Sequence, residues 1–486
     1  MKVLIASAEC SPFAKVGGLA DAISGIASSL RAGGVDAMVV IPFYPWIQSG
    51  FSAERVGALD GLRNGGEVWQ ARCEETGNQI WMVDPGSLFN RPGGAYADPS
   101  GADWPDSDQR FWSFSEAVVE IAADRAGLNW RADVVHVNDW HTAPVSLIMK
   151  EAGSDIPTVL SVHNHSFQGL FEETSQTYLK PHDICAKHYR LHDRFSFLRA
   201  GVVSANEITT VSHSYRRDLL RTPDGFGLEG DFGERCDQLS AIPNGIDTES
   251  WNPATDPVLK SRFCAEDLSG KGACKGDLKA GLGLPVDPGA PLIVVVSRLT
   301  VQKMSDRLPE LALAHWVDSP LSQFVILGRG DREIEERLKA FAEKHSSSFI
   351  FLNDYSDQMA RRMLGGADLL LHPSRFEPCG LVPIYAMRYG AVPIVTPTGG
   401  LHDLLNTSET QAGFMTASLG EDDVLQTMVS AVHTFQQGEG WARVVQAAMS
   451  VLRDWSDTVP AYLDVYGRAM GRHQAEVCTE HTVNLS

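Results

Sequence analysis

The sequence lacks the patterns that mark secreted, zinc-binding and membrane-spanning proteins. Its eight cysteines are scattered over 486 residues and none forms a Cys-x-x-Cys pair. This argues against zinc fingers, redox motifs and a disulfide framework, and favours reduced thiols. No apolar window reaches the roughly 18 residues that a transmembrane helix needs. The first apolar run, residues 2–6, is too short for a signal peptide. We therefore expect a cytoplasmic protein.

Positive charge is also scarce. The chain has 41 Lys and Arg against 61 Asp and Glu, a net charge of −20. Nucleic acids and anionic membranes require a basic face, so neither is an expected partner. The hydrophobic fraction of 43% is ordinary for a folded protein. The length predicts two or three domains. A soluble enzyme or carrier remains, and its oligomeric state stays open.

Short β-branched runs alternate with helical segments, and the alternation restarts in the second half of the chain. This rhythm is typical of parallel sheets covered by helices on both faces, which predicts an α/β protein with two doubly wound domains. We expect an N-terminal domain over 1–243 and a second domain over 244–460. Residues 461–486 are expected to form a helix and tail that pack back on the first domain. The Gly-rich stretch 263–288 reads as irregular.

The predicted elements have the lengths usual for such domains. The expected strands are 2–6, 37–41, 79–83, 134–137, 158–162, 292–297, 323–327, 349–352, 369–372 and 392–395. The expected helices include 18–32, 109–126, 333–344 and 358–364. Ligands of open α/β sheets bind beyond the carboxyl ends of the strands, so we expect a cleft between the two sheets.

Three motifs follow strands of the first domain. Lys15, Gly17 and Gly18 open a helix, where backbone amides and a cation suit an anion; a plain Gly-rich turn is the alternative. Asp139, beside an indole, suits sugar hydroxyls, although a helix cap is equally compatible. His163 is interpreted as a hydrogen-bonding or structural histidine, and a metal site is disfavoured. No Gly-x-Gly-x-x-Gly or Walker loop occurs at these turns.

Two further motifs follow strands of the second domain. Arg298 and Lys303 are two cations at a strand end, which suits a diphosphate, with a solvated basic turn as the alternative. Glu377 precedes an expected helix that begins near Gly380, where the helix field favours a carboxylate. Cys379 reads as a lining or packing thiol, since no cysteine-hydrolase arrangement accompanies it.

Together these segments resemble the bacterial glycogen synthase and plant starch synthase family, from residue 1 to about 470. The resemblance rests on several motifs in the family's order. They are Lys-x-Gly-Gly-Leu-Ala-Asp (15–21), Asn-Asp-Trp-His (138–141), His-Asn (163–164) with Gln-Gly (168–169), Asn-Gly-Ile-Asp (244–247), Ser-Arg-Leu-Thr-x-Gln-Lys (297–303), Pro-Ser-Arg-Phe-Glu-Pro-Cys-Gly-Leu (373–381) and Thr-Gly-Gly-Leu (398–401).

The resemblance implies the GT-B architecture, two Rossmann-like domains, and retaining transfer of glucose from ADP-glucose to the non-reducing 4-OH of an α-1,4-glucan. It implies no metal and no cofactor beyond the nucleotide sugar. Lys15, Arg298 and Lys303 would hold the diphosphate, with the Gly17 and Gly18 amides. The sugar and acceptor roles would fall to His163, Asn244, Glu377, Asp139 and Tyr96; the remaining donor positions would be Tyr355, Cys379, Gly380, Leu381, Gly399, Gly400 and Leu401.

Several positions depart from the family pattern. Met304 stands where the family usually has Gly, and Val382 and Pro383 replace Thr and Gln. Phe167 replaces a Tyr, and Pro397 stands near a usually basic position. These changes fall at the expected substrate cleft, so two alternatives stay open. One is a paralogue that joins a sugar or cyclitol from another nucleotide donor to a small acceptor; the other is an inactive glucan-binding paralogue.

Overall fold

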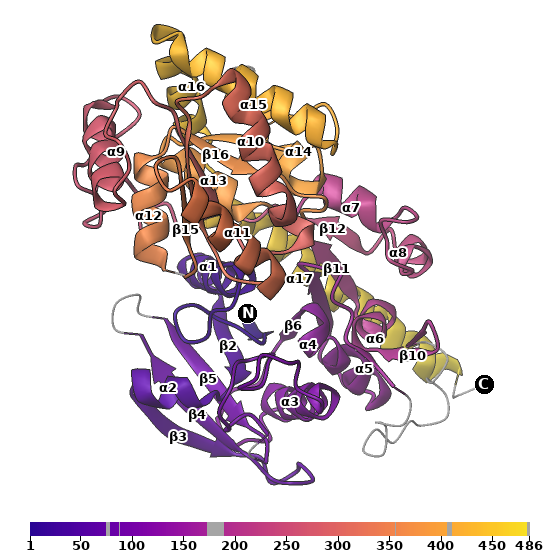
Figure 1. The fold of residues 1–486 in the computed structure, drawn as a ribbon. Coiled ribbons are helices and arrows are strands. Elements are labelled where there is room, and N and C mark those ends of the chain that lie inside the picture. Colours follow the sequence, from indigo (N-terminus) through magenta and orange to yellow (C-terminus); the bar gives the residue numbers. More distant parts are fainter. Residues whose placement is uncertain (74–77, 87, 173–188, 355, 406–410, 484–486) are drawn as a thin grey trace. The chain divides into compact units, whose positions relative to one another are not determined.

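The computed structural model describes residues 1–73, 78–86, 88–172, 189–354, 356–405 and 411–483 (Figure 1). The chain divides into two compact units, one formed by 1–245 with 455–486 and the other by 246–454. Residues 455–460 lie in the first unit because Trp455 packs against α1, where a Cβ on Gly25 would collide with its indole ring. No helix in the described part of the chain combines the length and apolar character needed to span a membrane.

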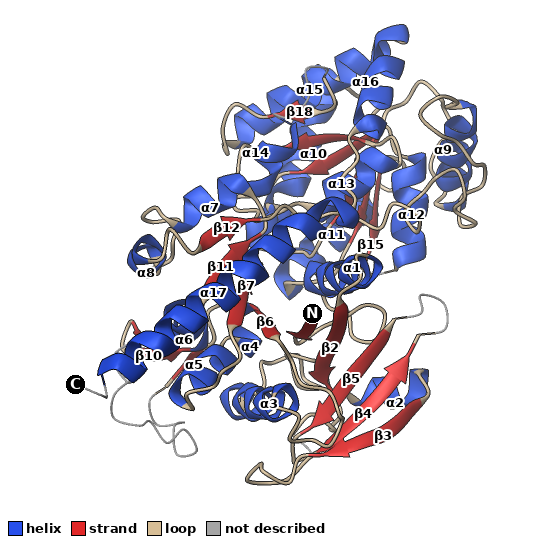
Figure 2. Cartoon of the chain, turned by 180° about the vertical axis from the view of Figure 1, so that it is seen from behind, coloured by secondary structure: helices blue, strands red, loops and turns tan. Residues whose placement is uncertain are grey.

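The first unit is built on a largely parallel sheet in the order β12-β11-β7-β6-β1-β2-β5-β4-β3. Only β3 and β4, at one edge (Figure 2), pair antiparallel with their neighbours. Strands β1, β6 and β7 are apolar or fully buried over nearly their whole length, as expected for strands covered on both faces. The strands of this unit are β1 (Lys2–Ala6), β2 (Asp36–Pro42), β3 (Ala53–Ala58), β4 (Glu67–Arg72), β5 (Gln79–Asp84), β6 (Val134–Asn138), β7 (Thr158–Val162), β11 (Glu207–Thr210) and β12 (Leu239–Ala241), with a small separate sheet of β8 (Leu170–Phe171), β9 (Arg190–Leu191) and β10 (Arg194–Ser196).

Side-chain caps help to start the helices of this unit. Ser196 and Ser212 each accept a hydrogen bond from the backbone N–H three residues on, and so begin α6 and α7. The helices are α1 (Gly18–Ala32), α2 (Pro45–Gly50), α3 (Ser107–Ala122), α4 (Asp139–Thr142), α5 (Pro144–Glu151), α6 (Phe197–Ser204), α7 (His213–Leu219), α8 (Glu229–Glu234), the 3₁₀ turn η4 (Trp455–Thr458) and α17 (Val459–Val483).

The C-terminal helix α17 is joined to the first unit by buried polar contacts with the sheet. The carboxylate of Glu207, on β11, is fully buried and pairs with Arg468 at 3.1 Å and Arg472 at 2.6 Å. Tyr466 contacts His136 Nδ1 at 2.9 Å, and His136 Nε2 contacts Ser161 at 2.6 Å. These contacts connect the helix to β6, β7 and β11, so α17 is an integral part of this unit.

The second unit has a wholly parallel sheet in the order β15-β14-β13-β16-β17-β18. Its central strand reads Leu-Ile-Val-Val-Val and is buried throughout. The strands are β13 (Leu292–Val296), β14 (Gln323–Leu327), β15 (Phe349–Leu352), β16 (Leu369–His372), β17 (Val392–Val395) and β18 (Phe414–Met415). The helices are α9 (Ser269–Gly281), η2 (Val301–Lys303), η3 (Ser305–Arg307), α10 (Leu308–Asp318), α11 (Arg332–Lys344), α12 (Asp357–Gly366), α13 (Leu381–Arg388), α14 (Gly399–Leu405), α15 (Glu421–Gln436) and α16 (Glu439–Ser450).

The fold class and the predicted strands are confirmed, but one local prediction is wrong. The stretch 263–288 contains helix α9 (Ser269–Gly281), although the sequence of this helix carries four glycines. Glycine disfavours a helix by about 1 kcal/mol relative to alanine. Cys274 and Leu278 are buried in the core of the unit, and α9 packs against α12. Tertiary burial therefore outweighs the weak local propensity.

The buried pairing of Glu207 predicts a large effect of a conservative change. Glu207→Gln leaves Arg468 and Arg472 without their charged partner, which should cost about 3 kcal/mol of stability. We expect a fall of roughly 6–12 °C in the melting temperature by calorimetry. The matched control is Asp155→Asn, whose pair with Arg131 is well exposed. Equal melting temperatures for the two variants would contradict this account.

Candidate functional site

The candidate residues lie at the carboxyl ends of the parallel strands, in one cluster on each unit. In the first unit most of them follow β1, β6 and β7, while Asn244 follows β12 and Tyr96 lies after β5. In the second they follow β13, β16 and β17. This is the edge at which open α/β sheets bind ligands.

Asp139 is the central acid of the first cluster. It directly follows β6 in a left-handed conformation (φ 55°), and its Oδ1 accepts hydrogen bonds from the backbone N–H of His163 (2.7 Å) and Asn164 (3.1 Å). Burial raises the pKa of Asp139 to about 7, although the two N–H donors oppose the shift. The carboxylate therefore joins the turns after β6 and β7, and the interpretation as a cap of its own helix is not supported.

His163 is held by Asn138 in a defined tautomer. The Asn138 Nδ2 donates to the Ala6 carbonyl at 3.0 Å, so its Oδ1, 2.9 Å from His163 Nε2, must accept from that nitrogen. Burial lowers the pKa of His163 to about 4, which keeps the ring neutral. His163 Nδ1 is then a hydrogen-bond acceptor.

Glu9 is a functional candidate that the sequence analysis missed. Its buried carboxylate accepts from the backbone N–H of Val16 (2.6 Å) and Gly17 (2.9 Å) and from the Tyr96 hydroxyl (2.6 Å). The Gly17 amide, expected to face a diphosphate, is therefore directed at Glu9, and Gly18 is the first residue of α1. The only available signal was an acid placed three residues after an apolar strand.

The remaining candidates of the first unit are Lys15, Tyr96 and Asn244. Lys15 pairs with Asp21 at 3.0 Å in the first turn of α1. Tyr96 stacks on His141 with ring centroids 4.9 Å apart. Asn244 is buried, and its Oδ1 has no hydrogen-bond partner among the described residues. An unsatisfied buried acceptor is costly in a folded protein, so this atom is suited to accept from a ligand hydroxyl.

Glu377 is the central acid of the second cluster. Its Oε2 accepts from Lys303 Nζ in a very short ion pair, from His372 Nε2 at 3.1 Å and from Ser374 Oγ at 3.2 Å. Burial alone would raise its pKa, but Lys303 and His372 hold the pKa of Glu377 well below its usual range. Burial and the nearby Lys303 charge lower the pKa of His372, so it donates as a neutral ring.

Two glycine turns fit closely against the backbone of Glu377. The Gly400 N–H donates to the Glu377 carbonyl at 2.9 Å, and a Cβ on Gly399 or Gly400 would collide with the carbonyl of Glu377 or Cys379. Gly380 has φ 85°, and a Cβ there would lie 2.6 Å from the buried Leu401 side chain. In this structure these glycines set the position of Glu377 and the start of α13.

The loop after β13 is bound to the loop after β16. Gln302 Nε2 donates to the Phe376 carbonyl at 2.9 Å, and Arg375 pairs with Asp306 at 2.8 Å. These contacts place Lys303 beside Glu377. Arg298, on the same loop, is exposed.

The departures from the family pattern have different structural consequences. Met304 adopts a left-handed conformation (φ 50°), and its side chain is buried in the core of the unit. Val382 and Pro383 lie in the first turn of α13 after Leu381, and Pro383 supplies no N–H. Cys379 is partly buried, and Tyr355 lies outside the described residues.

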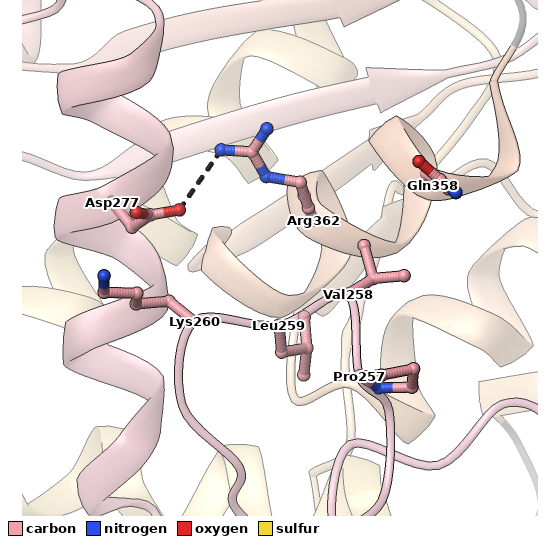
Figure 3. Close-up of a pocket in the computed structure, with 7 residues that line it drawn as sticks. All are labelled: Pro257, Val258, Leu259, Lys260, Asp277, Gln358 and Arg362. Atoms are coloured by element: carbon pink, nitrogen blue, oxygen red, sulfur yellow. Dashed lines mark hydrogen bonds and ion pairs between the residues drawn. The ribbon is translucent and has the colours of Figure 1, made fainter.

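Two further features are separate from these clusters. Within the described residues, no three His, Cys, Asp or Glu side chains gather as a metal site would require. A hollow of about 550 Å³ lies between α9, α12 and the segment 257–260 (Figure 3). It contains the Arg362–Asp277 ion pair at 3.1 Å and none of the candidate residues.

The raised pKa of Asp139 predicts a specific pH dependence of stability. Its folded-state pKa of about 7 exceeds the ordinary 3.8, so between these values the folded state holds a proton that the unfolded state has lost. Wild-type stability should therefore fall as the pH rises, by at most about 1.4 kcal/mol per pH unit. Asp139→Asn removes this contribution, so its melting temperature relative to wild type should increase from pH 4.5 to about 7 and then level off. A difference that is independent of pH would contradict the assignment.

Comparisons with known proteins identify relatives of this chain. Residues 2–234 match the starch synthase catalytic domain family, and residues 290–434 match the glycosyl transferases group 1 family. The chain is 38% identical to a glycogen synthase of Burkholderia thailandensis, over 98% of this chain and 92% of the relative. It is 35% identical to a glycogen synthase of Paramagnetospirillum magneticum, over 97% of this chain and 98% of the relative.

A solved structure gives the same result at the level of the fold. The catalytic domain of starch synthase IV from Arabidopsis thaliana, described as bound to ADP and acarbose, superposes with a TM-score of 0.86 at 29% identity, covering 97% of this chain and 99% of that one. Similarity over nearly the whole length of both chains leaves one conclusion: this chain belongs to the glycogen and starch synthase family of GT-B glycosyltransferases.

Proposed function

We propose that the chain transfers glucose from ADP-glucose to the non-reducing 4-hydroxyl of an α-1,4-glucan, with retention at the anomeric carbon. The reaction class follows from family membership. The choice of donor and acceptor is supported by the related starch synthase IV structure, which is described as bound to ADP and acarbose.

The observation that carries the proposal is the buried Lys303–Glu377 pair at the strand ends of the second unit. Lys303 is held in place by Glu377, and Arg298 lies on the same loop. Fixed cations stabilise a diphosphate most when it gains charge, which happens as the bond to the sugar breaks. Glu377 remains ionised and can accept hydrogen bonds from sugar hydroxyls.

The first unit offers acceptor atoms suited to a sugar. Neutral His163 presents Nδ1, Asn244 presents a buried unpartnered Oδ1, and Asp139 adds a carboxyl group. Sugar hydroxyls donate to such atoms. We assign these groups to orienting the transferred glucose and the acceptor, with Lys15 as a further cation for the diphosphate.

The proposed glucosyl transfer needs only the nucleotide sugar and the acceptor hydroxyl as reactants. The bond between the anomeric carbon and the β-phosphate oxygen breaks, and both electrons leave with ADP. The acceptor 4-hydroxyl attacks the same face, its oxygen forms the new glycosidic bond, and its proton passes to the departing phosphate. No protein nucleophile is needed, and the cations stabilise the charge on the leaving ADP.

A second candidate function is supported by the first turn of α13. Leu381, Val382 and Pro383 give this turn no hydroxyl, and Pro383 removes one N–H that could face an anion. The loss of a hydroxyl and of an N–H from this turn would change how the protein binds the phosphates of the donor. It favours a paralogue that uses another nucleotide sugar or a sugar-like acceptor.

Lys303→Met tests the proposed site. The variant removes the buried cation with little change in length, so transition-state stabilisation of the leaving ADP is lost. We expect kcat/KM for incorporation of radiolabelled glucose from ADP-glucose into glycogen to fall by about 100-fold or more. The control is Arg332→Ala, which breaks an exposed pair on α11 and should retain wild-type activity.

The donor is checked by a thermal-shift series with ADP-, UDP- and GDP-sugars. A ligand that binds only the folded protein raises its melting temperature by mass action. The largest shift with ADP-glucose supports the first candidate. A larger shift with another nucleotide, together with no incorporation from ADP-glucose by folded protein, supports the second. Turnover with any donor excludes an inactive paralogue.

A further inference from the structure

His372 is a buried polar residue at the end of an apolar strand. It closes the Leu-Leu-Leu-His run of β16, and its side chain is 3% exposed. A polar ring in this position is costly to desolvate unless a partner compensates it. Its partner is Glu377, whose Oε2 lies 3.1 Å from His372 Nε2. An ionised carboxylate has no proton to donate, so Nε2 carries the hydrogen of this bond.

The hydrogen bonds to the Glu377 side chain all meet one of its two oxygens. Oε2 accepts from Lys303 Nζ, from His372 Nε2 and from Ser374 Oγ at 3.2 Å. Among the residues that the structure describes, none donates a hydrogen bond to Oε1. Three donors fill the acceptor capacity of Oε2, so Oε1 is the oxygen that can accept from a ligand.

The donors to Oε2 are fixed to the ends of neighbouring strands. His372 is paired in the sheet with Val395 of β17. Ser374 is fully buried; its N–H donates to Thr396 Oγ1 at 2.9 Å, and that hydroxyl donates to the Ser374 carbonyl at 2.6 Å. Lys303 lies on the loop after β13. Oε2 is therefore held from the ends of β13, β16 and β17.

Lys303 alone would balance the charge of Glu377 without selecting an oxygen. A lysine ammonium is a point charge on a flexible stem and can pair with either oxygen of a carboxylate. The His372 ring and the Ser374 hydroxyl are short groups on a rigid strand end, and each reaches Oε2. These two neutral donors therefore determine which oxygen the protein uses.

We propose that His372 is a positioning residue for the transfer reaction, which holds Oε2 of Glu377 so that Oε1 accepts a hydrogen bond from a hydroxyl of the donor sugar. This role rests on the proposed function, in which Glu377 contacts the transferred glucose. Groups that orient a reacting sugar act mainly on the rate of the chemical step, since small displacements are costly there. His372 acts through Glu377 and needs no substrate contact of its own.

Methionine and glutamine at position 372 separate the hydrogen bond from the packing. Both side chains are unbranched and similar in length, but only glutamine carries an N–H to donate. His372→Met should lower kcat for glucose transfer from ADP-glucose to glycogen by about tenfold, the scale of one hydrogen bond to a charged group. His372→Gln should recover most of this loss. The affinity for ADP, which lacks the glucose, should be unchanged by titration calorimetry.

ADP-glucose analogues that each lack one glucose hydroxyl provide the sharpest test. Two contacts that depend on each other have effects that are not additive. The deoxy donor without the hydroxyl bound by Oε1 should therefore be transferred at similar rates by wild type and His372→Met. The other deoxy donors should keep the full difference between the two proteins. An equal loss with every donor would indicate a merely structural histidine and contradict the proposal.

Two further variants complete the design. His315→Met is the matched control, because His315 is also fully buried and its Nε2 contacts Ser322 Oγ at 3.0 Å. It lies on α10, which carries none of the candidate residues, so the variant should lower the melting temperature and leave kcat unchanged. Ser374→Ala removes the other neutral donor to Oε2 and should lose rate with the same donor dependence as His372→Met. It provides the test if His372→Met does not fold.

The outcomes distinguish the positioning role from the proposed function. A wild-type kcat in folded His372→Met overturns the positioning role alone, as does a loss in His372→Gln equal to that in His372→Met. A wild-type protein that transfers no glucose from ADP-glucose contradicts the proposed donor, and the variants are then compared with the nucleotide sugar that gives turnover. Equal rates of wild type and His372→Met with that donor overturn the positioning role as well. A wild-type protein inactive with every donor contradicts both.

Discussion

A buried carboxylate must be compensated by hydrogen-bond donors or by a cation, and both candidate clusters depend on this constraint. Glu9 and Asp139 recruit backbone N–H groups from the turns after β1 and β7, while Glu377 recruits Lys303 and His372. Asp139 and Glu377 each join loops that are distant in sequence but follow neighbouring strands, and Glu9 joins the start of its own loop to the residues that precede α1. The interactions that compensate the desolvation of each buried carboxylate therefore also fix the positions of the loops. Rigid placement of this kind is what a transferase needs to orient two substrates.

The chemistry of the two clusters differs because the compensating groups differ. Glu377 faces a lysine and two neutral donors, so its pKa lies well below the usual range and its charge is retained. Asp139 receives only two backbone N–H groups, and burial raises its pKa to about 7. One acid is thus a permanent anion that orients the Lys303 cation. The other can change its protonation state near neutral pH, and it responds to the charge of what binds beside it.

The sequence predicted the parallel strands well, because continuous apolar runs such as residues 292–296 have few alternatives in an α/β protein. It predicted Glu377, Lys303, Asp139 and His163 as candidates because each lies in the turn that follows such a run. It did not predict Glu9 as a site residue, and it did not predict that the Gly17 N–H donates to the Glu9 carboxylate. This hydrogen bond depends on the backbone conformation of the turn between the two residues, which no local sequence pattern indicates. Helix α9 was missed for a related reason: its stability comes from packing against α12, which single-sequence propensity does not contain.

The departures from the family pattern do not have equal weight for specificity. Met304 directs its side chain into the core, so the replacement of glycine changes the energy of the loop and leaves Lys303 paired with Glu377. Pro383 acts differently, because it removes a backbone N–H from the first turn of α13, directly after the Gly380 turn that follows Glu377. A helix N-terminus attracts anions through such N–H groups. Of these two departures, Pro383 is therefore the one that bears on donor preference.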